Sequence, residues 1–189
     1  MSVGTRPLSL VGFLELPETE PASEYIDGRV VQKMSPKFQH SVLELKLPNA
    51  VNAFAEPRRL GLAVPELRCT FAGRSFVFDL AYFQTDRIAY GPDGQLLNDV
   101  FLAPDLAAEI LSPGQSTRAA EARLRFAVKN GVRLAWLIDP RSRRAKVFRR
   151  SARPQTLSIG DSLDGNDVLP GFELPLKTVF GWLRRENIS

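Results

Sequence analysis

The chain contains two short apolar runs that each carry one carboxylate. This feature constrains the possible folds of the chain more than any other. The first run spans Phe76 to Phe83 and includes Asp79, and the second spans Leu106 to Leu111 and includes Glu109. Both runs have the length and composition of strands, with Gly, Pro or Asp nearby. A carboxylate inside a strand is costly to bury unless it is paired or binds a cation. Two of them on neighbouring strands would create a site for a divalent metal.

The first run predicts where the Asp79 side chain points if the whole run is one strand. Because side chains alternate along a strand, Asp79 would share a face with Val77 and Ala81. Phe78 and Leu80 would then lie on the opposite face. A simpler alternative is that both carboxylates stand at strand ends and cap turns.

Apolar spacing elsewhere predicts further helices and strands. The predicted helices cover residues 8–16, 39–55, 116–130 and 176–185, with Pro48 kinking the second or opening a new first turn. The predicted strands cover residues 60–64, 66–71, 132–138 and 146–149, with a hairpin over 25–34. The order strand, helix, strand between residues 106 and 138 predicts a crossover in a mixed sheet. We expect an α/β fold with one domain over residues 1–189, and disorder in residues 1–6.

Composition excludes several classes of protein. With 189 residues, 44% of them hydrophobic, the chain can bury a core, but no apolar run approaches a membrane span. One His and one Cys exclude zinc sites rich in these residues, and we expect Cys69 to be a small buried hydrophobe. The first residues lack the apolar region of a signal peptide, so we expect a cytoplasmic protein.

Positive charge is concentrated late in the chain. The formal net charge is +4, and basic residues cluster in 141–146 and 149–153. If these two segments form a hairpin, its basic side chains could contact the phosphates of a nucleic acid. They could also simply be solvent-exposed charges, and both interpretations stay open.

Earlier in the chain, His40 and Glu44 are four residues apart and would share a helical face. They too have a bland interpretation, as an ordinary surface histidine and a solvated charge.

A series of short stretches, in order along nearly the whole chain, matches the pattern of one family. The stretches are residues 13–17, 25–28, 35–36 with His40, 65–68, the Asp79 run, 103–113, 130–140 and 169–172. The most specific are Glu-Ile-Leu-Ser-Pro at 109–113 and Trp-Leu-Ile-Asp-Pro at 136–140. By these motifs the chain resembles the Uma-type restriction endonuclease family of the PD-(D/E)XK nuclease superfamily.

The resemblance implies a restriction-endonuclease-like fold, with a mixed central β-sheet flanked by helices. It also implies a site in which Asp79 and Glu109 bind Mg²⁺ or Mn²⁺. The basic residue of the site would come from the following helix, as Arg123 or, less well placed, Lys129. Pro104-Asp105 looks like the superfamily's Pro-Asp motif, but this family places its metal-binding Asp on the earlier strand.

The implied activity is endonuclease hydrolysis of phosphodiester bonds by Mg²⁺-activated water. His40 or Glu44 would orient water or complete the site. We expect nucleic acid as the partner, DNA before RNA, with no membrane and with the protein as a homodimer.

Two departures from the family pattern leave a second function open. Phe78 stands where the family usually has Pro, and Arg123 stands where it usually has Lys. Arginine keeps its charge but cannot deprotonate to activate water. The alternative is a catalytically inactive nuclease fold that serves as a DNA-binding or protein-interaction module. In either case we expect Arg123 to pair with Glu109 or Asp79.

Overall fold

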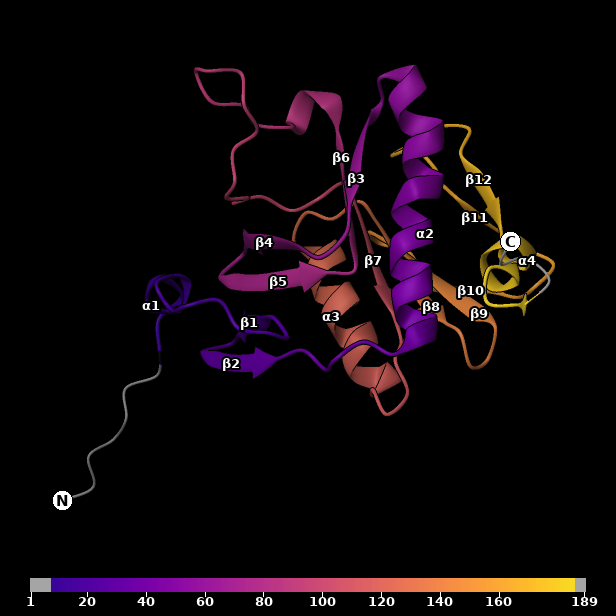
Figure 1. Cartoon of the computed structure of the whole chain (residues 1–189), viewed down its shortest axis with the longest axis horizontal. Coiled ribbons are helices and arrows are strands. Elements are labelled where there is room, and N and C mark those ends of the chain that lie inside the picture. Colours follow the sequence, from indigo (N-terminus) through magenta and orange to yellow (C-terminus); the bar gives the residue numbers. More distant parts are fainter. Residues whose placement is uncertain (1–7, 186–189) are drawn as a thin grey trace.

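The computed structural model describes residues 8–185 and shows a mixed α/β fold (Figure 1). The helices are α1 (Leu10–Leu14), α2 (Phe38–Ala55), α3 (Thr117–Lys129) and α4 (Leu176–Gly181), with short 3₁₀ turns at Glu56–Arg58 and Thr85–Arg87. The strands are β1 (Ser23–Ile26), β2 (Arg29–Gln32), β3 (Gly61–Val64), β4 (Leu67–Phe71), β5 (Arg74–Phe78), β6 (Leu80–Gln84), β7 (Leu106–Ile110), β8 (Leu134–Asp139), β9 (Arg144–Arg149), β10 (Gln155–Leu157), β11 (Ser162–Asp164) and β12 (Glu173–Pro175). The expected disorder of residues 1–6 concerns a segment outside the described residues.

The strands form two main sheets. A six-stranded sheet has the order β10-β9-β8-β7-β6-β3, and a four-stranded sheet has the order β2-β1-β5-β4. The strands β7 and β8 are parallel, with Glu109 opposite Leu137, and α3 connects them. This confirms the predicted crossover in a mixed sheet. The sequence did not predict the three short strands β10, β11 and β12, because three residues are too few to show an alternating pattern.

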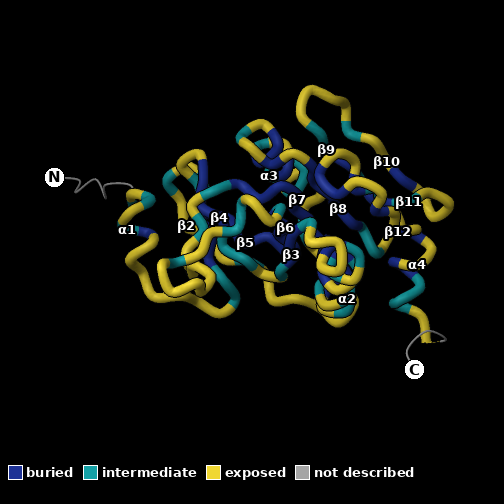
Figure 2. Tube along the Cα trace, turned by 90° about the horizontal axis from the view of Figure 1, so that it is seen from above, coloured by how far each residue is buried: buried dark blue, intermediate teal, exposed yellow. Residues whose placement is uncertain are grey.

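Two layers of helix cover the six-stranded sheet. Figure 2 shows α2 and α3 on opposite sides of its strands. On one face α2 and the C-terminal segment pack against alternate residues of β7 and β8, including Leu106 and Trp136. On the other face α3 packs with Ala107, Leu137 and the phenylalanines of the four-stranded sheet. Of the helices within residues 8–185, none is both long and apolar enough to cross a bilayer.

The prediction of one continuous strand through Asp79 is wrong. The chain ends β5 at Phe78, bends at Asp79 and starts β6 at Leu80. The reason is a change of partners, since β5 pairs with β1 and β4 while β6 pairs with β3 and β7. The bend breaks the alternation, so Ala81 packs in the same cluster as Phe78, and Leu80 packs in the other. Asp79 therefore stands at the junction of the two sheets.

The helices agree with the sequence patterns more closely. Ser116 caps α3 by accepting the N–H of Ala119, and the helix stops before Asn130, as predicted. Pro48 lies buried inside α2, which continues as one helix rather than starting again. Cys69 is buried in β4, as expected, and burial raises the pKa of its thiol to about 12.

Candidate active site

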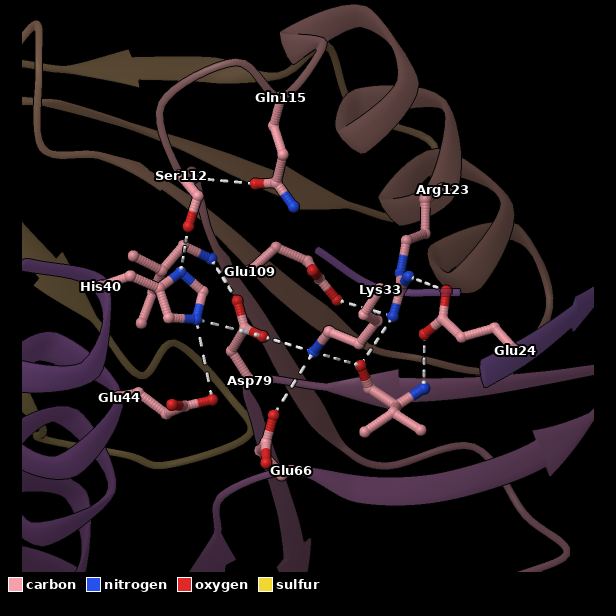
Figure 3. A network of polar contacts seen from close by, with 12 residues as sticks. Glu24, Lys33, His40, Glu44, Glu66, Asp79, Glu109, Ser112, Gln115 and Arg123 are labelled. Carbon is pink, nitrogen blue, oxygen red and sulfur yellow. Dashed lines mark hydrogen bonds and ion pairs between the residues drawn. The ribbon is translucent and has the colours of Figure 1, made fainter. Parts of the chain in front are cut away.

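Polar side chains from distant parts of the sequence converge on Asp79 (Figure 3). The Asp79 side chain is 2% exposed, and both of its oxygens have partners. Its Oδ2 accepts the backbone N–H of Ile110 at 2.7 Å, and its Oδ1 accepts from Lys33 Nζ at 2.7 Å. The bond to Ile110 ties the sheet junction to the end of β7, so the position of this carboxylate is set by the backbone.

The first turns of α2 bring His40 and Glu44 to Asp79. The Nε2 atom of His40 lies 3.7 Å from Glu44 Oε1 and 3.7 Å from Asp79 Oδ1. One ligand atom of each of the three residues lies within 4.8 Å of the others. The two residues share a helical face, as their spacing predicted, and with Asp79 they form a cluster that can hold a metal ion.

The orientation of His40 suits such a role. Its Nδ1 lies 3.1 Å from the hydroxyl of Ser112, just beyond β7, so its Nε2 is the atom directed at the two carboxylates. Burial lowers the pKa of His40, but Glu44 and Asp79 outweigh burial and leave the pKa raised. The position in front of Nε2 is therefore one that favours a proton or a metal cation. Metal-binding histidines are usually oriented in the same way, by a hydrogen-bond partner on the other ring nitrogen.

A second group of charges surrounds Glu109 on the α3 side. Arg123 Nη2 lies 3.0 Å from Glu109 Oε1 and donates to Val77 O at 2.8 Å, while Nη1 pairs with Glu24. This confirms the expected pairing of Arg123 with Glu109. Burial raises the pKa of Glu109 to about 8, although the guanidinium of Arg123 acts in the opposite direction. Glu24 also accepts the N–H of Val77 at 2.7 Å, so it fixes both the peptide and the guanidinium.

Lys33 is the main residue of the site that the sequence did not reveal. It follows β2, and its Nζ donates to Asp79 Oδ1 and, at 3.1 Å, to Val77 O. Burial lowers its pKa, but the carboxylates of Asp79 and Glu109 outweigh burial and leave the pKa raised. The four residues of β2 are all exposed, so nothing in their pattern indicates that the next side chain is buried.

A buried carboxylate oxygen of Glu44 supports the metal interpretation. Glu44 Oε1 accepts no hydrogen bond from any residue in the described range, and its near cationic neighbour is His40 Nε2 at 3.7 Å. Glu109 Oε1 also accepts no well-aligned hydrogen bond, but it is ion-paired with Arg123 at 3.0 Å. Buried polar atoms are nearly always hydrogen-bonded, so the Glu44 oxygen in particular has room for a further partner. Carboxylates with one imidazole are ligands that divalent metals accept. The residues present therefore fit a bound cation.

One candidate from the sequence, Lys129, lies away from these charged residues, and so does Asp105, which the family pattern excluded as a metal ligand. Lys129 is exposed in the last turn of α3 and lines a surface groove with Arg125 and Arg150. Asp105 is buried at the other end of β7 from Glu109, where it pairs with Arg87 at 2.6 Å and receives the N–H of Gln84. Its contacts are those of a structural ion pair.

Comparisons with known proteins identify the family and support the fold. A model of the Uma2 family, described as "Putative restriction endonuclease", matches residues 10–177. The crystal structure of a "putative nuclease" from Anabaena variabilis matches with a TM-score of 0.91 and 35% sequence identity, over 94% of this chain and 100% of that one. No curated protein matches the chain. The family match extends over both sheets and every residue described around Asp79.

Proposed function

Because this chain belongs to the Uma2 family, whose model is described as "Putative restriction endonuclease", we propose that it hydrolyses phosphodiester bonds of nucleic acids with a divalent cation. The observation that carries the proposal is the cluster of His40, Glu44 and Asp79, whose ligand atoms lie within 4.8 Å of one another. We also propose that the chain acts as a single nuclease domain. A cytoplasmic location, DNA as the preferred substrate and a homodimer stay predictions from the sequence.

The metal would be held by Asp79 with His40 and Glu44, and Glu109 would complete the site from β7. When bound, a divalent cation would lower the pKa of a water molecule and neutralise charge on the phosphate. The sequence implied Mg²⁺ or Mn²⁺ with Asp79 and Glu109 as ligands. The imidazole of His40 adds a nitrogen donor, which suits transition metals better than Mg²⁺, so Mn²⁺ is the first ion to test.

Two cationic side chains of the site are the candidates for contact with the substrate. Lys33, just after β2, and Arg123, in α3, both contact the carbonyl of Val77. Arginine stays protonated in proteins, and Lys33 keeps its proton beside Asp79, so neither is suited to remove a proton from water. We propose that they stabilise negative charge on the phosphate in the transition state.

The test of this function compares wild type with Arg123→Lys on DNA and RNA, with Mn²⁺ and with Mg²⁺. Cleavage should require the metal. The variant should still cleave, because Lys has the same charge as Arg and is the residue that the family usually has at this position. One ammonium cannot reach Glu24, Glu109 and Val77 O as the guanidinium does, so the free energy of unfolding should fall by about 1–3 kcal/mol. Gel assays measure cleavage, and urea unfolding measures stability.

The same experiment tests the alternative function. The contacts of Arg123 are also those of a structural ion pair, which favours an inactive nuclease fold that binds DNA or protein. If wild type and Arg123→Lys are both inert with either metal on every nucleic acid tried, the nuclease proposal is abandoned.

A second prediction concerns Lys33→Met, which keeps the length of the side chain but removes its charge. The ammonium lies 2.7 Å from Asp79 Oδ1 and competes with a metal for that oxygen, so Mn²⁺ affinity should rise. The cleavage rate at saturating Mn²⁺ should nevertheless fall about 100-fold, a typical loss when a group that stabilises transition-state charge is removed. Titration calorimetry and single-turnover cleavage measure the two effects.

Lys177→Met, at an exposed position of α4, is the matched control and should change neither quantity. A Lys33→Met variant that binds Mn²⁺ more tightly and cleaves as fast as wild type would show that Lys33 only balances the charge of Asp79.

A further inference from the structure

A cavity of about 650 Å³ adjoins the candidate active site. Its lining includes His40 and Ser112, which contact each other beside Asp79 (Figure 3). The remaining lining comes from the start of α2, the loop between β7 and α3 with the first residue of α3, and the end of β8 with the turn that follows it. Since β7 and β8 are parallel, their carboxyl ends lie at the same edge of the sheet, where open α/β sheets commonly bind ligands. The cavity thus has the size and place of a substrate site.

Phe38 lines this cavity and is left open to solvent. It is the first residue of α2, two positions before His40, and it is 80% exposed. A single exposed apolar side chain needs no partner by itself. The position of Phe38 in the lining of a cavity beside the candidate site makes its ring available to a ligand there. A flat aromatic ring is also the surface on which proteins stack unpaired bases, whatever the base.

The charged residues of the lining favour an anionic ligand. Lys37 and Arg141 are both exposed there and form no ion pair with any residue in the described range. Asp139 is the acidic residue of the lining, but its carboxylate accepts the N–H of Arg141 at 3.0 Å and the hydroxyl of Ser142 at 2.6 Å. Its charge is therefore held within its own turn, and the two cations are available to phosphates.

We propose that this cavity binds an unstacked nucleotide of a single strand beside the scissile phosphate. The base stacks on Phe38, and Lys37 and Arg141 contact the flanking phosphates. The inference rests on the proposed function for its choice of ligand, and it names the substrate class as single-stranded segments or ends. Bases inside a duplex are already stacked and cannot reach the ring unless they are flipped out.

The test measures binding without cleavage. Fluorescence anisotropy in EDTA gives the affinity of the full-length protein for a mixed-sequence single-stranded oligonucleotide, as DNA and as RNA, and for the matching duplex. Phe38→Ala should bind single strands roughly 5- to 150-fold more weakly, the effect of removing one base-stacking aromatic side chain. Phe38→Trp should restore binding, and duplex affinity should change little. A 2-aminopurine base in the oligonucleotide reports stacking directly through its fluorescence.

The control is Phe101→Ala, because Phe101 is 65% exposed but does not line the cavity. It should bind like wild type, and thermal unfolding of each variant checks the fold. Equal loss of single-strand and duplex affinity in Phe38→Ala, or no loss at all, would overturn the proposal, as would a wild-type protein that binds no single strand. Loss of single-strand binding in a protein that cleaves nothing with Mn²⁺ would support this binding site while refuting the nuclease function.

Discussion

Asp79→Asn is expected to abolish metal-dependent cleavage and to lower Mn²⁺ affinity by at least about 100-fold, since even the partners of a metal ligand contribute 10- to 100-fold. Asparagine has nearly the same shape and can still accept the N–H of Ile110, which Asp79 Oδ2 accepts at 2.7 Å. What it removes is the negative charge that faces His40 and Lys33. Calorimetry with Mn²⁺ measures the affinity, and a gel assay measures cleavage.

The control for Asp79→Asn is Asp105→Asn. Asp105 is equally buried and ion-paired, with Arg87 at 2.6 Å, but it lies at the opposite end of β7 from the site. Its substitution should lower stability and leave Mn²⁺ affinity unchanged. If instead Asp79→Asn binds Mn²⁺ as wild type does, the metal centre is not where we place it. If wild type itself binds no metal, the inactive-module alternative is the better account.

Trp136→Ala should lower the free energy of unfolding by about 3–5 kcal/mol, the usual cost of removing a large buried side chain. Trp136 is 0% exposed in β8, which lies between β7 and β9. Its ring is stacked on Phe172 with the centroids 6.0 Å apart. The substitution would therefore leave a cavity between the sheet and the C-terminal segment. Urea unfolding followed by circular dichroism measures the loss.

Two further substitutions make this prediction sharper. The indole N–H of Trp136 donates no hydrogen bond to any residue from 8 to 185, so Trp136→Phe loses volume but no bond and should cost clearly less than alanine. Trp182→Ala, at a half-buried position after α4, should also cost less. A cost below about 1 kcal/mol for Trp136→Ala would contradict a central position, because core substitutions of this size exceed that value.

The sequence predicted the part of the site that depends on local pattern. The strand around Glu109, the helix that begins after Ser116 and the strand of Trp136 all follow from hydrophobic period and caps. Once these three elements are in order, the crossover brings Arg123 back over Glu109, and their ion pair follows. His40 and Glu44 were paired correctly because four residues make about one turn of helix.

Only the tertiary structure decided which other groups meet these residues. Lys33 reaches Asp79 across 46 positions, and Glu24 reaches Arg123 across 99, because the β1–β2 hairpin packs beside β5. The bend at Asp79 likewise depends on which strands pair on either side of it. The sequence of a short apolar run does not indicate which strands will pair with it. Local patterns determine elements and their faces, since these depend on near neighbours in the chain. The charge environment of a buried carboxylate depends on distant segments, and packing alone brings those segments together.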